Sequence, residues 1–144
     1  MAYALDLPVI TIDSLEALAV ASISDREKAI YIPMIDARRM EVYTAVFDQQ
    51  GAVLSPPHAK IIDENSFQPW VKESYTIVLS GNGAQKCRTI LTNSCFIYTD
   101  ILNEAENMAT LAWKSLDQKN WSDLAYFEPS YIKPPNITVS KKKL

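Results

Sequence analysis

Glycine is scarce in this chain, in which only Gly51, Gly81 and Gly83 occur among 144 residues. At the usual frequency of about 7%, a chain of this length would contain about ten. A P-loop needs two glycines at a fixed spacing, and the Rossmann fingerprint needs three. The glycines present fit neither spacing, so both of these nucleotide-binding loops are excluded.

Histidine and cysteine are equally restricted. The single histidine, His58, excludes every zinc site that uses two histidines. Cys87 and Cys95 are too few for a four-cysteine zinc site or a disulfide framework. Ser14, Ser80 and Cys87 have no histidine nearby in the sequence, and Cys87, on an apolar helix face, is interpreted as a buried thiol. We therefore expect no catalytic residues, no metal site and no cofactor.

The rest of the composition is that of a soluble globular domain, with 48% hydrophobic and 22% charged residues. The net charge of -3 argues against free-standing nucleic-acid binding, which usually requires a basic excess. No apolar run approaches the ~18 residues of a membrane span, and no secretory signal begins the chain. Together with the few cysteines, these features predict a cytoplasmic protein that does not enter the membrane.

The hydrophobic pattern predicts alternating strands and helices. Strands are expected at 8–12, 29–36, 41–48, 52–54, 75–80 and 95–98. Helices are expected to begin at Asp13, at Asp63 or Asn65, after Gly83, and at Asn103. Asp13 and Asn103 each have a glutamate three residues later, which matches the capping box. Pro56 and Pro57 are expected to end the strand at 52–54.

The strands at 29–36 and 41–48 are apolar on both faces, and only 37–40 separates them. They are predicted to form an antiparallel hairpin in the centre of a sheet that helices cover. The strand at 52–54 extends the hairpin to a three-strand antiparallel meander, after which helices and strands alternate. This order predicts an α/β domain with a mixed sheet, of the RNase H-like or actin-like ATPase (ASKHA) fold. The analogy concerns the fold and says little about function.

Gly81, Asn82, Gly83 and Ala84 form a candidate ligand-binding turn between a strand and a helix. Such a turn exposes backbone N–H groups at a helix N-terminus, where an adenosine or a phosphate can bind. The alternative is a tight turn with only a structural role, because a lone G-x-G is a weak signature.

A second candidate is the end of the central hairpin, where Asp36, Arg38, Arg39 and Glu41 bring four charges together. Either arginine can bind a phosphate or a carboxylate through two parallel hydrogen bonds. Alternatively, Asp36 and Glu41 neutralise the arginines across the hairpin. A partner-binding edge and a solvated turn are the two interpretations left open.

Four stretches carry recognisable motifs: AYALDLPVITIDSLEALA at 2–19, DARRMEVY at 36–43, GNGA at 81–84 and EPSYIK at 128–133. They resemble, in order, the LAYALDIPLIGVSTLEALA stretch, the D-A-R-R-x-E-V-Y hairpin, the G-N-G-A turn and the closing E-P-x-Y-L/I-K/R segment of the TsaB family, also called YeaZ. The hairpin motif adds Tyr43 to the candidate residues. The four motifs span the whole chain in family order.

The resemblance also implies a domain organisation. Residues 1–7 look like the remnant of a helix that leaves a missing N-terminal domain, 8–133 like the C-terminal actin-like domain, and 134–144 like an extended basic tail. A frayed terminus is the alternative for 1–7. The phosphate loops and the main partner-binding helices of the family belong to that N-terminal domain, so 81–84 would be half of a nucleotide site. If the N-terminal helix is missing, the apolar surface on which it packs is exposed, which predicts a homodimer or a rearranged terminus.

The family implies a role in tRNA modification. TsaB is a cytoplasmic scaffolding subunit without catalytic residues, which acts with its catalytic paralogue TsaD and the ATPase TsaE. The complex transfers a threonylcarbamoyl group to the adenosine beside the anticodon, so contact of this chain with tRNA would be indirect. The alternatives are a glycoprotease-like peptidase of the same fold and a degenerate nucleotide-binding module.

Overall fold

A computed structural model gives the structure of this chain and describes residues 1–134. Its centre is a five-stranded sheet with the order β3-β2-β1-β4-β5. The strands are β1 (Ala29–Asp36), β2 (Glu41–Phe47), β3 (Val53–Ile61), β4 (Thr76–Ser80) and β5 (Phe96–Tyr98). β1, β2 and β3 are antiparallel, whereas β4 and β5 run parallel to β1. The predicted mixed sheet with a three-strand meander is therefore confirmed.

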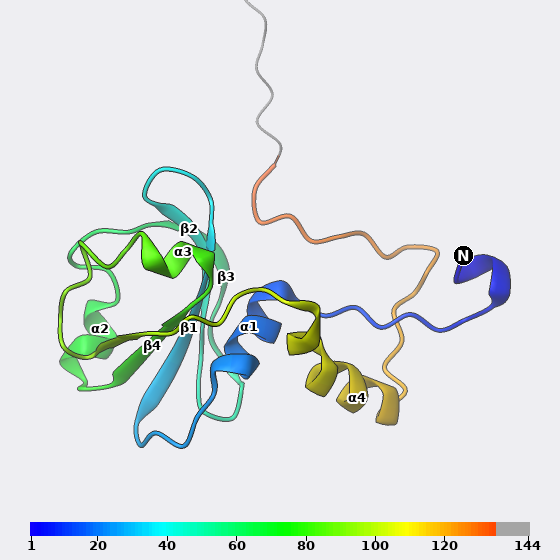
Figure 1. Cartoon of the computed structure of the whole chain (residues 1–144). Helices are drawn as coiled ribbons and strands as arrows, with labels where there is room; N and C mark the ends of the chain where they lie inside the picture. Colours follow the sequence, from blue (N-terminus) through cyan, green and yellow to red (C-terminus); the bar gives the residue numbers. More distant parts are fainter. Residues whose placement is uncertain (135–144) are drawn as a thin grey trace, which may run out of the picture.

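Helices cover both faces of this sheet. The helical elements are η1 (Tyr3–Leu5), α1 (Ser14–Ser22), α2 (Gln68–Lys72), α3 (Asn82–Gln85), η2 (Ala105–Met108) and α4 (Ala109–Asp117). Figure 1 shows α1 over one face and α2 and α3 on the other, with α4 drawn apart from the sheet. None of the helices in 1–134 is both long enough and apolar enough to cross a membrane.

Two clusters of buried residues fill the space between the sheet and its helices. Ile30, Ile32 and Met34 of β1 belong to the cluster beneath α2 and α3. Tyr31 of β1 belongs to the cluster beneath α1. Because neighbouring residues of a strand point to opposite faces, β1 is buried on both sides, as its continuous apolar run predicted.

Helix α1 begins where the sequence predicted a cap. The Oδ1 atom of Asp13 accepts hydrogen bonds from the backbone N–H groups of Leu15 (2.8 Å) and Glu16 (3.1 Å). These bonds satisfy donors that the first helical turn leaves free. Leu18 and Ala19 are fully buried, so this face of the helix belongs to the core.

The predicted strand at 8–12 is wrong. This segment is extended but joins no sheet. The carbonyl of Val9 accepts a hydrogen bond from Ser122 N–H (2.8 Å), and the hydroxyls of Thr11 and Ser122 lie 2.7 Å apart. The β-branched residues favour an extended backbone, but the segment lies against the chain after α4 instead of a sheet edge.

The predicted end of the third strand at Pro56 and Pro57 is also wrong, because β3 continues to Ile61. Within 1–134, β3 lies at the edge of the sheet and pairs only with β2, with a register irregularity near Thr44. Proline is tolerated on an edge strand, where its missing N–H can face away from the neighbouring strand. The strand thereby places His58 opposite Thr44.

The later helices differ in detail from the prediction. Glu104, and not Asn103, is the N-cap of η2, and its side chain makes no capping hydrogen bond. α3 ends at Gln85, so Cys87 lies beyond it, although it is fully buried as expected. α4 contains no buried residue. Apart from Pro134, the expected extended basic tail at 134–144 lies outside the described residues.

Candidate functional site

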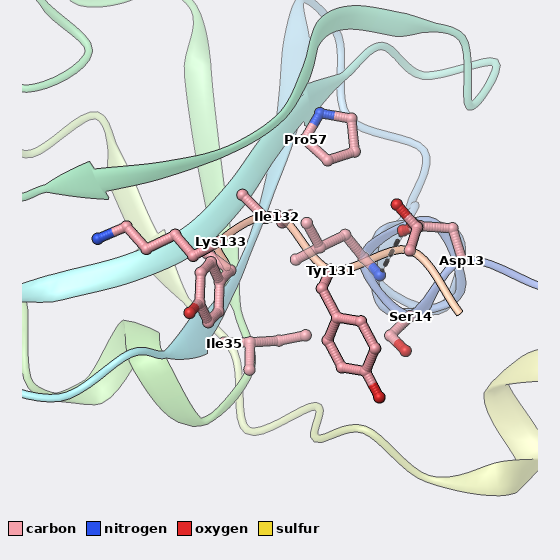
Figure 2. A pocket seen from close by; sticks show the side chains of 10 residues that line it. Asp13, Ser14, Ile35, Pro57, Tyr131, Ile132 and Lys133 are labelled. Atoms are coloured by element: carbon pink, nitrogen blue, oxygen red, sulfur yellow. Dashed lines mark hydrogen bonds between the residues drawn. The ribbon is translucent and has the colours of Figure 1, made fainter. Parts of the chain in front are cut away.

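The four motif-bearing stretches converge at the end of the sheet where β1 finishes. A cavity of about 250 Å³ lies there. It is lined by Asp13, Ser14 and Leu15 from the start of α1, by Ile35, Tyr43 and Pro57 from three strands, and by Ser130, Tyr131, Ile132 and Lys133. Figure 2 shows Tyr131 projecting between Ile35 and Ser14, while Lys133 points away toward the hairpin. Three of the four motifs thus line one cavity.

The fourth motif, the G-N-G-A turn, is joined to the hairpin by a side chain. The Oδ1 atom of Asn82 accepts a hydrogen bond from the backbone N–H of Asp36 at 2.9 Å. The turn is also held by the loop that follows β5, since the N–H of Gly81 donates to the carbonyl of Ile101 at 2.8 Å. Asn82 therefore acts as a bridge between two motifs that lie far apart in the sequence.

Both glycines of this turn are required by close packing on β1. Gly81 has a φ of +91°, and a Cβ at this position would lie 2.4 Å from the carbonyl oxygen of Met34. A Cβ on Gly83 would lie 3.0 Å from backbone atoms of Met34 and Ile35. Packing thus accounts for both glycines, as the structural alternative supposed. Nucleotide contact at Gly81, Asn82, Gly83 and Ala84 stays a prediction.

The tip of the β1–β2 hairpin has an unusual backbone. Arg38 (φ 69°) and Arg39 (φ 47°) both adopt the left-handed conformation, which few residues other than glycine populate. Asp36 holds this conformation, because its Oδ1 atom accepts a hydrogen bond from Arg38 N–H at 2.9 Å. The N–H of Ala37 donates to the carbonyl of Glu41 at 3.1 Å. The turn therefore presents two adjacent arginines on a fixed backbone.

The two hairpin acids are paired with lysines and not with the arginines. Lys86, which follows α3, forms an ion pair with Asp36 and donates to the carbonyl of Glu41 at 2.6 Å. Lys133, in the closing motif, forms an ion pair with the Glu41 carboxylate. Within 1–134 neither arginine takes part in an ion pair. The predicted neutralisation of the arginines across the hairpin is therefore wrong.

These pairs show which functional residues the sequence did not reveal. The hydrogen bond from Lys86, more than any other contact, lowers the pKa of Asp36 below its ordinary value of 3.8. Lys86 carries no motif, so nothing in the sequence indicated its role. Lys133 is the last residue of the closing motif, and its pairing with Glu41 gives that motif a structural meaning.

His58 and Cys87 lie in different parts of the molecule and have separate partners. The Nδ1 atom of His58 is 2.8 Å from the carbonyl oxygen of Pro56 on the same edge strand. The Sγ atom of Cys87 lies 3.3 Å from the carbonyl of Gly83, and burial raises the pKa of the thiol. A buried thiol with a raised pKa is a poor nucleophile because little thiolate is present. No group of three metal-ligating side chains is found in the described part of the chain.

Comparison with known proteins agrees with this architecture, first at the level of the fold. The mixed sheet flanked by helices is the RNase H-like, actin-like fold of the solved YeaZ structures. The family model described as "TsaD: tRNA N6-adenosine threonylcarbamoyltransferase" matches residues 1–139, and the chain belongs to this family. The resemblance to TsaB-type proteins is thereby confirmed at the family level.

Two solved structures from Pseudomonas aeruginosa illustrate the likeness. One, described as an uncharacterized protein with similarity to peptidase YEAZ, has a TM-score of 0.72 and 22% identity and matches 92% of this chain. The other, YeaZ, has a TM-score of 0.70 and 22% identity and matches 90% of this chain. The chain covers 62% and 61% of the length of these two proteins. No curated protein matches this chain significantly.

Proposed function

We propose that this chain is a non-catalytic, TsaB-like scaffolding subunit of the cytoplasmic complex that forms threonylcarbamoyladenosine beside the anticodon of tRNA. It would act with a TsaD-like catalytic subunit and a TsaE-like ATPase. One observation carries the proposal: the four family motifs meet at one end of the sheet and are joined by structural contacts. Asn82 bonds to Asp36, and Lys133 pairs with Glu41.

The side chains at the meeting point suit a platform more than a reaction centre. The cavity beside them is open, and Tyr131, which lines it, is 81% exposed. The charged groups at the hairpin are paired as Lys86 with Asp36 and Lys133 with Glu41. Paired charges on an exposed surface fix geometry but do not provide a desolvated acid or base.

The contacts explain how such a platform would be kept rigid. The segment 130–133 crosses from the start of α1 to the hairpin, where Lys133 is held by Glu41. The hairpin is in turn held by Lys86 and Asn82 beside α3. A partner that binds this end of the sheet would meet a surface whose parts are already positioned. The net charge of -3 supports indirect contact with tRNA.

The direct test is reconstitution with the TsaD-like and TsaE-like proteins of the same source, threonylcarbamoyl-adenylate and unmodified tRNA. The modified nucleoside is quantified by mass spectrometry after digestion of the tRNA, with and without this chain. We expect its yield to fall at least about tenfold when the chain is omitted, because scaffolding positions the reactants. An equal yield without the chain would refute the proposal.

The two alternatives are tested with the same preparation. A peptidase that uses His58 or Cys87 would lose peptide hydrolysis in His58→Ala or Cys87→Ala, whereas a scaffold with these substitutions would still support modification. A nucleotide-binding module centred on Gly81 to Ala84 would release heat when titrated with ATP or ADP. Peptide hydrolysis that disappears in either variant would replace the scaffold proposal by the peptidase.

A further inference from the structure

We infer that the tip of the β1–β2 hairpin is a docking site for a protein segment in which carboxylates flank an apolar side chain. We call this site the hairpin tip and define it as 37–41 together with Ile61. The inference rests on the proposed function, because it names the surface through which a scaffolding subunit would hold a partner. The argument starts from the shape of the tip.

The hairpin tip contains a hollow of about 580 Å³. Its lining residues are Ala37, Arg38, Arg39, Met40, Glu41 and Ile61. Ile61 ends the edge strand β3 opposite Glu41, and it is 71% exposed. Met40 packs its inner side against the core. The hollow therefore offers an exposed apolar wall, which costs free energy while water covers it.

The charged groups around this apolar wall leave an excess of positive charge. The acids of the hairpin, Asp36 and Glu41, are occupied by Lys86 and Lys133. Arg38 and Arg39 are exposed and make no ion pair with any residue of 1–134. A chain with a net charge of -3 thus concentrates two uncompensated positive charges beside an apolar hollow.

The backbone of the hairpin tip presents both arginines in a defined conformation. Both have a positive φ, a conformation that glycine or asparagine adopts at much lower cost. Residues kept in such conformations are concentrated at ligand-binding sites. The bond from Arg38 N–H to the Asp36 carboxylate fixes the turn before any ligand arrives. Little ordering of the backbone is then needed on binding.

These features select a protein segment and not a nucleic acid. A guanidinium matches a carboxylate or a phosphate equally well. The apolar wall formed by Met40 and Ile61 has no counterpart in recognition of a phosphate backbone, whereas it suits a leucine-sized side chain. The pI of about 5.1 also disfavours a nucleic acid. The carboxylates of the partner would face the arginines, and its apolar side chain would cover Ile61.

The test uses the 144-residue chain labelled for NMR, with the peptide EDLED as the acidic and apolar probe and the peptide KKLKK as its charge-reversed control. We expect EDLED to shift the backbone resonances of 37–41 and Ile61, and KKLKK to leave them unchanged. A third titration uses single-stranded oligouridylate. Shifts at the hairpin tip with oligouridylate but not with EDLED would assign the site to RNA and overturn the inference, as would no shift with any probe.

Substitutions then identify the groups responsible. In the double variant Arg38→Asn and Arg39→Asn the positive φ remains accessible, so the fold is preserved while both charges are lost. We expect at least about tenfold weaker binding of EDLED, because both guanidinium groups that would pair with its carboxylates are removed. Ile61→Ser should weaken binding less, and Arg26→Gln, at an exposed arginine outside the tip, should not change it. Equal affinity in the double variant and the wild type would refute the inference.

The peptide titration and the reconstitution assay answer different questions. If EDLED binds at the tip but omission of the chain leaves tRNA modification unchanged, the proposed function fails and the docking site stands. If modification depends on the chain but EDLED leaves 37–41 and Ile61 unshifted, the docking site fails and the proposed function stands.

Discussion

The Oδ1 atom of Asn82 accepts a hydrogen bond from the backbone N–H of Asp36 at 2.9 Å, although 46 positions separate the two residues in the sequence. This bond connects the G-N-G-A turn to the D-A-R-R hairpin at the end of β1. An asparagine is suited to the position, because its short amide reaches the neighbouring backbone without adding a charge beside the Asp36–Lys86 pair. Asn82, the second residue of the turn, therefore has a defined structural role.

Replacing Asn82 should loosen this connection. We expect Asn82→Ala to lower the free energy of unfolding by about 0.5–1 kcal/mol, the usual net value of one exposed hydrogen bond. Urea denaturation followed by circular dichroism measures the change. Asn103→Ala is the matched control, because Asn103 precedes η2 without being its cap, and its effect should be smaller. Equal losses in the two variants would show that the bond contributes nothing.

Gly81 provides a sharper test, because an added Cβ would meet close neighbours there but not at Gly51. Gly81→Ala would place a Cβ 2.4 Å from Met34 O at a φ of +91°, so we expect a loss of more than about 3 kcal/mol or failure to fold. Gly51→Ala is the control, since φ is also positive there (+77°) but the nearest atom to its Cβ is 3.7 Å away. Strain alone should then cost about 1 kcal/mol. The midpoints of urea denaturation show which variant loses more stability. A larger loss for Gly51→Ala than for Gly81→Ala would contradict the prediction.

The pair between Lys86 and Asp36 predicts a dependence of stability on pH. The pKa of Asp36 is lowered in the folded state, chiefly by the Lys86 hydrogen bond and then by Arg38 N–H. The ionised carboxylate therefore stabilises the fold above the unfolded-state pKa, and this contribution is lost as the pH falls through the lower folded-state pKa. Because Asp36 is exposed, the contribution should stay under about 1 kcal/mol.

Asp36→Asn keeps an acceptor for Arg38 N–H but removes the charge. The variant should be less stable than the wild type at neutral pH, and the difference should shrink as the solution is acidified through the carboxyl range. Urea denaturation across a pH series measures both curves. Asp25→Asn, at an exposed carboxylate without an ion pair in 1–134, controls for the loss of one negative charge. A difference that grows toward acid would have the wrong sign for this mechanism.

The sequence predicted the centre of the fold well, because there local pattern and burial agree. The continuous apolar run of β1 indicated a strand covered on both faces, and its bounds, Ala29–Asp36, are those expected. Asp13 was recognised as a cap because N-capping involves only the next three residues, whereas the same pattern at Asn103 was wrong by one residue. Elements determined by nearest neighbours in the chain were therefore accessible to prediction.

The periphery was predicted less well, because its structure depends on distant partners. The β-branched residues of 8–12 indicated a strand, but in the structure they contact Ser122 and pair with neither edge strand of the sheet. Prolines such as Pro56 and Pro57 would end a central strand, but an edge strand tolerates them. Whether a strand lies at the edge depends on the arrangement of the whole sheet.

At the candidate site, the motifs predicted which segments matter but not how they are joined. The arginines and acids of the hairpin are adjacent in the sequence, which suggested that they pair with one another. In the structure the lysines that pair with Asp36 and Glu41 come from 50 and 92 positions away. Such pairings follow from the tertiary fold alone.

The last prediction concerns the apolar surface around α4, where Trp113 is 66% exposed and Tyr126 is 85% exposed. Large exposed apolar residues favour association, so we expect the weight-average mass of the chain to rise with concentration toward that of a dimer. Light scattering after size-exclusion chromatography measures this mass. Trp113→Lys should shift the protein toward the monomer by removing apolar area and adding repulsion between copies. Lys72→Glu, on α2 at the opposite side of the sheet, should leave the mass unchanged. A wild-type mass that stays monomeric at every concentration would count against self-association through this surface.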